Sequence, residues 1–237
     1  MKISIVFPVF NEQLLLRYNI LKVFNFCKDQ LSENWQIIIS DNGSNDKTTE
    51  IGKDLERKYQ KIRYIRVKTQ GKGEGVISAW QIFPADIYIF MDIDLATDLS
   101  ALHDLINEIK KGNDIVVGSR FITGAKVSRS LFRKILSYAL KLVLKVLLHP
   151  PVQDMPCGFK AVNQKVINDI VPKIQNKTWF FDTEMLILAQ KAGLKIKDIP
   201  IIWNEDTNNK RQSKVGIFKV IKEYIKNIYL MVTQKQE

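Results

Sequence analysis

Short runs of apolar, β-branched and aromatic residues alternate with helical patterns along the first half of this chain. The runs, each typical of a buried strand, lie at residues 3–7, 36–40, 62–67, 87–91 and 115–117. Apolar side chains at the three-and-four spacing of amphipathic helices lie between them, at residues 12–28, 48–59, 75–83 and 99–111. Regular alternation of strand and helix predicts an α/β fold, with a mostly parallel central sheet and helices on both faces.

Polar side chains follow four of the predicted strands directly. The four segments are Asn11-Glu12, Asp41-Asn42-Gly43-Ser44, Asp92-Ile93-Asp94 and Gly118-Ser119-Arg120. In parallel sheets, ligands bind beyond the carboxyl ends of the strands, near the point where the strand order reverses. We therefore expect these four segments to meet at one edge of the sheet and to form one site.

Asp92 and Asp94 are separated by one residue, so both side chains lie on the same side if the backbone stays extended. Two carboxylates that close repel each other unless a cation lies near them. Mg²⁺ or Mn²⁺ suits carboxylate oxygens and can bridge to the phosphates of a substrate. The alternative is structural: Asp94 caps the next helix and Asp92 only ends a strand. A D-x-D pattern by itself is weak, but its position after a buried strand favours metal binding.

Asp41 and Glu12 also have two interpretations. Asn-Gly and neighbouring Asx residues form turns at the end of any strand, so the 41–46 segment is expected to turn. A carboxylate there could also accept hydrogen bonds from a nucleobase N–H or a ribose hydroxyl. Lys72, between Gly71 and Gly73, lacks the Walker spacing; the segment is either a flexible turn or a place where Lys72 meets a nucleotide diphosphate.

The chain has 36 Lys and Arg against 25 Asp and Glu, and its formal net charge of +11 favours an anionic partner. Zinc-finger spacing, a basic heptad helix and an aromatic RNA-binding signature are all absent from the sequence, so nucleic acid is not expected. The two cysteines, Cys27 and Cys157, form no C-x-x-C pattern, and His103 and His149 show no ligand spacing. Phospholipid and phosphorylated substrates remain as partners.

Two basic amphipathic stretches, residues 131–148 and 216–232, suggest contact with a membrane surface. The alternative is that each packs on the domain as an ordinary helix whose lysines reach solvent. No apolar run is as long as a spanning helix needs, and the N-terminus lacks the pattern of a signal peptide. We expect a cytoplasmic protein held peripherally on the cytoplasmic face of a membrane, or by a membrane-embedded partner protein.

Taken together, the motifs resemble the family-2 glycosyltransferases of the GT-A fold, and within them the polyprenyl-phosphate sugar synthases. The matching segments are Pro8-Val9-Phe10-Asn11-Glu12, Asp41-Asn42-Gly43-Ser44, Gly71-Lys72-Gly73, Asp92-Ile93-Asp94, Gly118-Ser119-Arg120, Phe132-Arg133-Lys134, Asp154-Met155-Pro156-Cys157-Gly158-Phe159-Lys160 and Phe181-Asp182-Thr183-Glu184. The segments 157–160 and 179–184, and Trp203 followed by Glu205, are closer to the dolichyl-phosphate β-glucosyltransferase branch. The resemblance implies a Rossmann-like GT-A domain over residues 1–212, including helix 131–148, and an amphipathic helix over residues 213–237.

The resemblance also implies roles for single residues. It assigns the metal, Mg²⁺ or Mn²⁺, to Asp92 and Asp94. The residues implied to bind the nucleotide sugar are Pro8, Phe10, Glu12, Asp41, Lys72 and Asp92. The acceptor phosphate is assigned to Arg120, Arg133 and Ser137. The carboxylates implied near the reacting centre are Asp154, Asp94 and Asp182.

The implied reaction is inverting transfer of a hexose from a nucleotide diphosphate sugar to a polyprenyl or dolichyl phosphate, with glucose and UDP-glucose favoured. A phosphate acceptor is largely dianionic at neutral pH, so it needs little help from a base. The alternatives are a family-2 transferase acting on a saccharide hydroxyl in cell-surface polysaccharide synthesis, a dolichyl-phosphate mannose synthase using GDP-mannose, and a binding protein without turnover. The chain departs from the family pattern at Asn42, where a second Asp is common, and before Ser213-Lys214, where a glycine is common.

Overall fold

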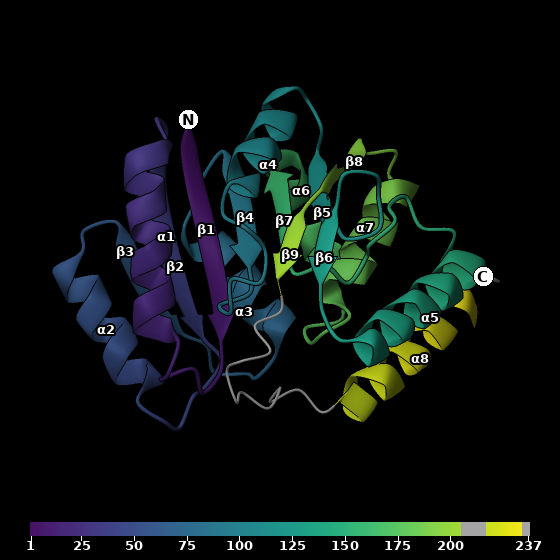
Figure 1. Ribbon diagram of the computed structural model, residues 1–237, viewed down its shortest axis with the longest axis horizontal. Coiled ribbons are helices and arrows are strands. Elements are labelled where there is room, and N and C mark those ends of the chain that lie inside the picture. Colours follow the sequence, from purple (N-terminus) through teal and green to yellow (C-terminus); the bar gives the residue numbers. More distant parts are fainter. Residues whose placement is uncertain (205–216, 234–237) are drawn as a thin grey trace.

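The computed structural model describes residues 1–204 and 217–233, which fold as strands and helices in alternation (Figure 1). The strands are β1 (Lys2–Val9), β2 (Asn34–Asp41), β3 (Ile62–Arg66), β4 (Ile87–Met91), β5 (Ile115–Ser119), β6 (Lys126–Ser128), β7 (Phe159–Asn163), β8 (Ile196–Pro200) and β9 (Ile202–Asn204). The helices are α1 (Leu16–Gln30), α2 (Thr48–Lys58), α3 (Lys72–Ile82), α4 (Ala101–Lys110), α5 (Leu131–Leu148), α6 (Gln164–Asp169), the short 3-10 helix η1 (Val171–Lys173), α7 (Phe181–Lys191) and α8 (Ile217–Thr233).

Seven strands form the main sheet in the order β3-β2-β1-β4-β7-β5-β8, and β6 pairs with β9 in a small second sheet. All neighbours in the main sheet are parallel except β7, which runs antiparallel to both β4 and β5. The order reverses between β1 and β4. The carboxyl ends of β1, β2, β4 and β5 therefore share one edge with the beginning of β7, which confirms the predicted α/β class and mostly parallel sheet.

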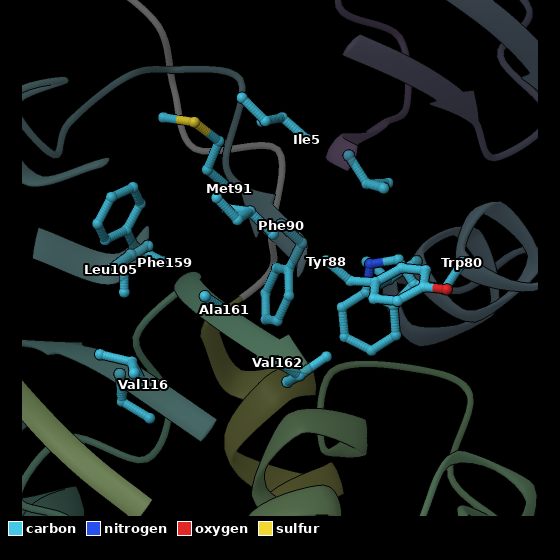
Figure 2. Packing of buried hydrophobic residues seen from close by; sticks show 14 of the residues in the cluster. Ile5, Trp80, Tyr88, Phe90, Met91, Leu105, Val116, Phe159, Ala161 and Val162 are labelled. Atoms are coloured by element: carbon cyan, nitrogen blue, oxygen red, sulfur yellow. The ribbon is translucent and has the colours of Figure 1, made fainter. Parts of the chain in front are cut away.

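Strands β1, β4 and β5 are buried on both faces, which explains why their sequences are apolar runs without alternation. Trp80 of α3 and Phe181 of α7 pack against Phe90 of β4, with ring centroids 6.0 and 5.4 Å apart. Figure 2 shows Trp80 beside Tyr88, and Leu105 of α4 beside Phe159 elsewhere in the core. Helices on both faces thus hold the strand that leads to the predicted carboxylate pair.

Helices α5 and α8 lie side by side at one end of the molecule, away from the centre of the sheet (Figure 1). Across the described residues, neither these helices nor any other combines the length and apolarity that crossing a bilayer requires. The predicted boundary between residues 212 and 213, the motif residue Glu205 and the departure before Ser213 all fall in the 205–216 segment, outside the described residues.

The structure differs from the sequence predictions at two places. The Gly71-Lys72-Gly73 segment is not a free turn, because α3 begins at Lys72. Gly73 is needed there for close packing, since a Cβ at this position would lie 2.6 Å from Cβ of Phe181. The five predicted strands are present, but the sequence does not predict β7, which lies between β4 and β5 in the sheet. Its five residues contain the charged Lys160, which interrupts the apolar pattern that marks a buried strand.

Candidate active site

The carboxylate pair lies in a turn that follows β4, not in extended backbone as the sequence suggested. The amide of Leu95 donates to the carbonyl of Asp92 at 3.3 Å, and Leu95 has a φ of 52°. A left-handed conformation is unfavourable for a branched side chain and typically costs about 1–2 kcal/mol. The side chain of Ile93 is buried between the two acids, and its carbonyl accepts from Asn19 at 2.7 Å. Asp94 is exposed and Asp92 is partly exposed, so both carboxylates reach the surface of the same turn.

Lys72 meets this turn from the first residue of α3. Its Nζ lies 2.7 Å from Oδ1 of Asp92, and only 10% of its side chain is exposed. Burial lowers the pKa of Lys72, but the carboxylates of Asp92 and Asp182 outweigh burial and raise that pKa above its ordinary value. Lys72 is therefore charged at neutral pH and stands beside the carboxylate pair.

Gly158, one residue before β7, leaves the space in which the Asp92 carboxylate lies. A Cβ at this position would overlap Oδ2 of Asp92. A small cavity of about 10 Å³ lies next to it; its lining includes Asp92, Asp94, Gly158 and Trp203. Nε1 of Trp203 is buried and has no hydrogen-bond partner in the part of the chain that the structure describes.

We expect Gly158→Ala to weaken the binding of the predicted metal ion at Asp92. The new methyl group would force the Asp92 carboxylate to swing away, while the fold would survive because only the end of one side chain must move. Changes next to a metal ligand typically reduce metal affinity about 10- to 100-fold. The Mn²⁺ concentration for half-maximal UDP binding, measured by calorimetry, should rise by that factor with an unchanged melting temperature. An unchanged Mn²⁺ requirement would show that Asp92 is not a ligand.

Asp41 is fully buried, and its carboxylate is occupied by its own surroundings. Oδ1 accepts from the amide of Ser44 at 2.8 Å, and Oδ2 accepts from Thr49 Oγ1 and Tyr64 Oη, each at 2.7 Å. Burial raises the pKa of Asp41, but these hydrogen bonds outweigh it and bring the pKa below its ordinary value. The turn interpretation of this segment is confirmed. We expect Asp41 to shape the predicted nucleotide site by holding this turn.

The other residues predicted to meet a nucleotide lie where β1 ends, beside the Asp41 turn. Val9 pairs with Asp41 across β1 and β2. The amide of Glu12 donates to Thr48 at 2.7 Å, and the side chain of Glu12 is buried. Pro8 lies within β1 and is half-buried, whereas 40% of Phe10 is exposed. The end of β1 therefore offers Phe10 at the surface, next to the turn that Asp41 stabilises.

Arg120 and Asp154 form a buried ion pair with two-point contact. Nε and Nη2 of Arg120 donate to the two carboxylate oxygens of Asp154 at 2.7 and 2.8 Å, and the Arg120 amide donates at 3.0 Å. Asp154 is fully buried, and 10% of the Arg120 side chain is exposed. The Arg120 guanidinium also lies 4.9 Å from the ring centroid of Trp203. The side chain of Arg120 therefore has a fixed orientation between Trp203, which lies next to the turn of Asp92 and Asp94, and the helix α5.

Asp182 forms a second buried ion pair, with Lys160 of β7. Nζ of Lys160 lies 2.8 Å from Oδ2 of Asp182, and it also donates to the carbonyls of Met155 and Cys157. Lys160 is fully buried, and Asp182 Oδ1 is buried without a hydrogen-bond partner among the described residues. The pair therefore ties α7 to the loop that carries Asp154.

A cavity of about 330 Å³ opens between α5 and the loop before β7. Its basic lining residues are Arg120, Arg129, Arg133, Lys141 and Lys145, and its apolar lining residues include Phe121, Leu136, Leu140, Leu144, Val152, Met155 and Trp179. Ser137 also lines it, and its hydroxyl accepts from Nη1 of Arg129 at 2.7 Å. The structure brings all three residues predicted to bind the acceptor phosphate, Arg120, Arg133 and Ser137, to this one cavity.

Trp179 lies between the cavity and the turn of Asp92 and Asp94. Its segment is one of those that carry the resemblance, but no role was assigned to Trp179. Its ring centroid lies 5.3 Å from Nζ of Lys72, and its side chain also lines the cavity. Lys160 and Trp203 were also named in motifs without a role, whereas Arg129 stood outside them. The signal for Arg129 was its place two residues before a basic helix; that for Lys160 was a charge inside a strand-like segment.

The mostly parallel sheet with two carboxylates after β4 agrees with the arrangement that the resemblance to GT-A glycosyltransferases implies. The sequence model described as glycosyl transferase family 2 matches residues 4–171, and the chain belongs to that family. The protein is therefore an enzyme of the glycosyltransferase type, as its motifs suggested.

Named relatives cover most of the chain. It is 28% identical over 243 residues to dolichyl-phosphate beta-glucosyltransferase of Saccharomyces cerevisiae, covering 94% of this chain and 73% of the yeast protein. It is 28% identical to dolichol-phosphate mannosyltransferase of Pyrococcus furiosus, covering 100% of this chain and 65% of that enzyme. It is 27% identical to glycosyltransferase AglD of Haloferax volcanii, covering 88% of this chain but only 34% of AglD. These relatives are similar to the chain over nearly its whole length and are themselves longer.

The fold also resembles solved structures. Glucosyl-3-phosphoglycerate synthase from Mycobacterium tuberculosis, in complex with Mn²⁺, UDP and glucosyl-3-phosphoglycerate, superposes with a TM-score of 0.70. The alignment covers 97% of this chain and 79% of the synthase, with 17% sequence identity. At that identity the likeness shows the shared fold.

Proposed function

We propose that this chain transfers a hexose, with glucose favoured, from a nucleotide diphosphate sugar, with UDP-glucose favoured, to a polyprenyl or dolichyl phosphate. The observation that carries the proposal is the basic and apolar cavity beside the carboxylate turn. Arginines suit a phosphate, and apolar walls suit the hydrocarbon chain attached to it. The names of the yeast and Pyrococcus relatives, which cite dolichyl or dolichol phosphate with glucose and mannose, support the same acceptor class.

On the donor side, Asp92 and Asp94 would hold a divalent cation, Mg²⁺ or Mn²⁺. Within residues 1–204 and 217–233, no three His, Cys, Asp or Glu side chains cluster as a metal site. The donor set of Asp92 and Asp94 fits an ion that keeps waters and binds substrate phosphates, and the space at Gly158 leaves the Asp92 carboxylate room. When bound, the ion would stabilise the charge of the departing diphosphate. Lys72 would contribute a second positive charge from α3.

On the acceptor side, Arg120 and Arg133 would orient the phosphate for attack on the anomeric carbon, with inversion. Asp154 holds Arg120 by two hydrogen bonds, so we assign Asp154 a positioning role. A phosphate dianion is already a nucleophile at neutral pH, and alignment with electrostatic stabilisation would supply most of the rate. The phosphate oxygen forms a bond to the anomeric carbon as the bond to the nucleoside diphosphate breaks.

The ion pairs favour a phosphate acceptor over a saccharide hydroxyl. A hydroxyl needs a base to remove its proton. Of the carboxylates implied near the reacting centre, Asp154 and Asp182 are the candidates for that base. Both are buried and paired, with Arg120 and Lys160 respectively. Transfer to a saccharide hydroxyl remains the second candidate, and transfer of mannose from GDP-mannose differs only in the donor.

The outer face of α5 supports a membrane-surface location. Its exposed apolar side chains are Leu131, Ile135, Tyr138, Leu142, Val143, Val146 and Leu147. Arg133, Lys141 and Lys145 lie instead along the cavity. Helix α5 is thus apolar on its inner side, where Leu136, Leu140 and Leu144 line the cavity, and also on its outer side, which an ordinary surface helix leaves polar. A lipid surface would cover that side and bring a polyprenyl phosphate to the cavity.

The test is release of UDP from UDP-glucose with Mn²⁺, measured with and without polyprenyl phosphate and with free saccharides. The proposal predicts release that depends on the lipid phosphate. Turnover on a free saccharide, with no response to the lipid, would support the second candidate instead. A panel of donors that includes GDP-mannose identifies the sugar.

We expect Arg133→Ala to weaken binding of the acceptor without affecting binding of the donor. Hydrogen bonds to charged groups contribute about 1.5–3 kcal/mol, so the KM for polyprenyl phosphate should rise about tenfold to a hundredfold. The Kd of UDP with Mn²⁺ should stay unchanged. Lys134→Ala is the matched control, because Lys134 is the neighbouring cation on α5 but does not line the cavity. An effect confined to donor affinity would contradict the assignment.

A further inference from the structure

Trp179 occupies the junction between the two halves of the proposed reaction. One side of its environment is Lys72, whose Nζ lies 5.3 Å from the ring centroid and 2.7 Å from Asp92 Oδ1. The other side is the cavity, which Trp179 lines together with Arg120 and Arg133. The side chain is 37% exposed, so part of the ring is open to a ligand. An indole offers a broad apolar face and one N–H donor, which suits a molecule with both C–H and O–H groups, such as a sugar.

The backbone just before Trp179 is held by the first turn of α3. The carbonyls of Lys177 and Thr178 accept from the amides of Glu74 and Gly73, at 2.8 and 3.1 Å, in the first turn of α3. This is the turn that carries Lys72. The position of the Trp179 segment is therefore linked to the position of Lys72.

Glu223 of α8 holds the same segment from the opposite side. Its Oε1 accepts from the hydroxyl of Thr178 and from the amides of Trp179 and Phe180, at 3.0 and 3.3 Å for the two amides. The next residue, Tyr224, is buried, and its hydroxyl lies 3.3 Å from Thr183 Oγ1 and 3.5 Å from the Trp179 carbonyl. Three donors of residues 178–180 thus converge on one carboxylate oxygen of Glu223, which lies more than forty residues further along the chain, in α8.

Helix α8 has a second, outward side. Ile225 and Tyr229 are largely exposed, while Tyr224 and Ile228 are buried against the domain. Helix α8 packs beside α5, whose outer face is also apolar (Figure 1). The helix that holds the Trp179 segment therefore belongs to the surface that we assign to the lipid.

We propose that Glu223 is a positioning residue, which fixes Trp179 at the point where the transferred sugar passes from donor to acceptor. The inference rests on the proposed sugar transfer and deepens it. Without Glu223, the amides of Trp179 and Phe180 lose their acceptor, whereas the hydroxyl of Thr178 keeps Asn176 Oδ1. The segment is then held by α3, by its local contacts and by the long contact of Tyr224 Oη with the Trp179 carbonyl. Small misplacements of groups that orient a substrate reduce rates strongly.

The experiment compares Glu223→Ala with Glu223→Gln, whose amide oxygen can accept the same hydrogen bonds. Asp169→Ala is the control, because Asp169 is an exposed carboxylate at the end of α6, outside α5 and α8. We expect Glu223→Ala to lower kcat at saturating donor and lipid about tenfold to a hundredfold, with the Kd of UDP and Mn²⁺ within about twofold of wild type. Glu223→Gln should recover most of the rate, and Asp169→Ala should resemble wild type.

A fluorescence measurement tests the position of Trp179 without any substrate. The emission of Trp179 is obtained in each variant by subtracting the spectrum of the same variant with Trp179→Phe. Glu223→Ala should shift this emission to longer wavelength as the ring becomes more exposed, and Glu223→Gln should not. An unchanged emission, or a kcat equal to wild type in Glu223→Ala, would overturn the proposal. So would equal impairment of both variants with a matching loss of thermal stability. Because the emission needs no acceptor, it stays informative if transfer to lipid fails.

Discussion

Asp94→Ala is expected to abolish metal-dependent binding of UDP and to lower turnover about a thousandfold, while the protein stays folded. Loss of one group that stabilises transition-state charge typically costs about 10²–10³ in rate, and Asp94 would hold the ion that carries the diphosphate. Asp94 is exposed, and its Oδ1 accepts from the Ala96 amide at 3.3 Å, so its removal disturbs little packing. Calorimetric titration with UDP, with and without Mn²⁺, measures the effect.

Asp98→Ala is the matched control for that experiment. Asp98 is an exposed carboxylate four residues further along, and it accepts from the amide of Ser100 at 2.9 Å. It should retain Mn²⁺-dependent UDP binding. If Asp94→Ala still binds UDP more tightly in Mn²⁺ than without it, the assignment of the metal to this turn is wrong.

Asp154→Ala should cause the largest loss of stability among single changes at the site. Removal of one partner from a buried ion pair leaves an uncompensated charge and costs about 3–5 kcal/mol. Arg120 would keep its charge while losing both carboxylate hydrogen bonds. Urea denaturation should show this fall in the free energy of unfolding. Lys111→Ala, which breaks the exposed Lys111–Glu108 pair, should leave it close to the wild-type value.

A second variant separates positioning from catalysis. Replacing both partners, with Arg120→Met and Asp154→Leu together, should recover most of the lost stability, because apolar pairs of similar size can replace buried ion pairs. Turnover should stay low, since the cavity has lost the guanidinium of Arg120. If Asp154→Ala were instead as stable as wild type but inactive, that result would indicate that Asp154 is a catalytic base. It would then favour transfer to a saccharide hydroxyl over transfer to a lipid phosphate.

Much of the first half of the fold was predictable because β1, β4 and β5 are buried on both faces. Runs such as 87–91 have a single apolar signal, and residues directly after them must lie at the carboxyl edge. The same reasoning found Asp92, Asp94 and Arg120. It could not find β7, because the charge of Lys160 is neutralised by Asp182, which lies 22 residues further along and in contact only after folding.

Orientation was the other limit. The period of helix 131–148 predicts a basic side and an apolar side, but it does not say which side faces the domain. In the structure, basic and apolar side chains of α5 line the cavity together, and further apolar side chains are exposed, so neither the ordinary surface helix nor the core helix describes α5. Asp41 shows the same limit: its partners Thr49 and Tyr64 come from α2 and β3, and they occupy a carboxylate that the sequence left free for a nucleotide.

The most direct test of the proposed function is the identity of the product. The protein is incubated with UDP-glucose, Mn²⁺ and a polyprenyl phosphate in vesicles, and the lipid fraction is analysed by mass spectrometry and phosphorus-coupled NMR. The proposal predicts a hexose joined to the lipid phosphate through its anomeric carbon, with the β configuration expected from inversion of an α-linked donor. A hexose joined to a saccharide hydroxyl, with the lipid phosphate unmodified, would contradict it.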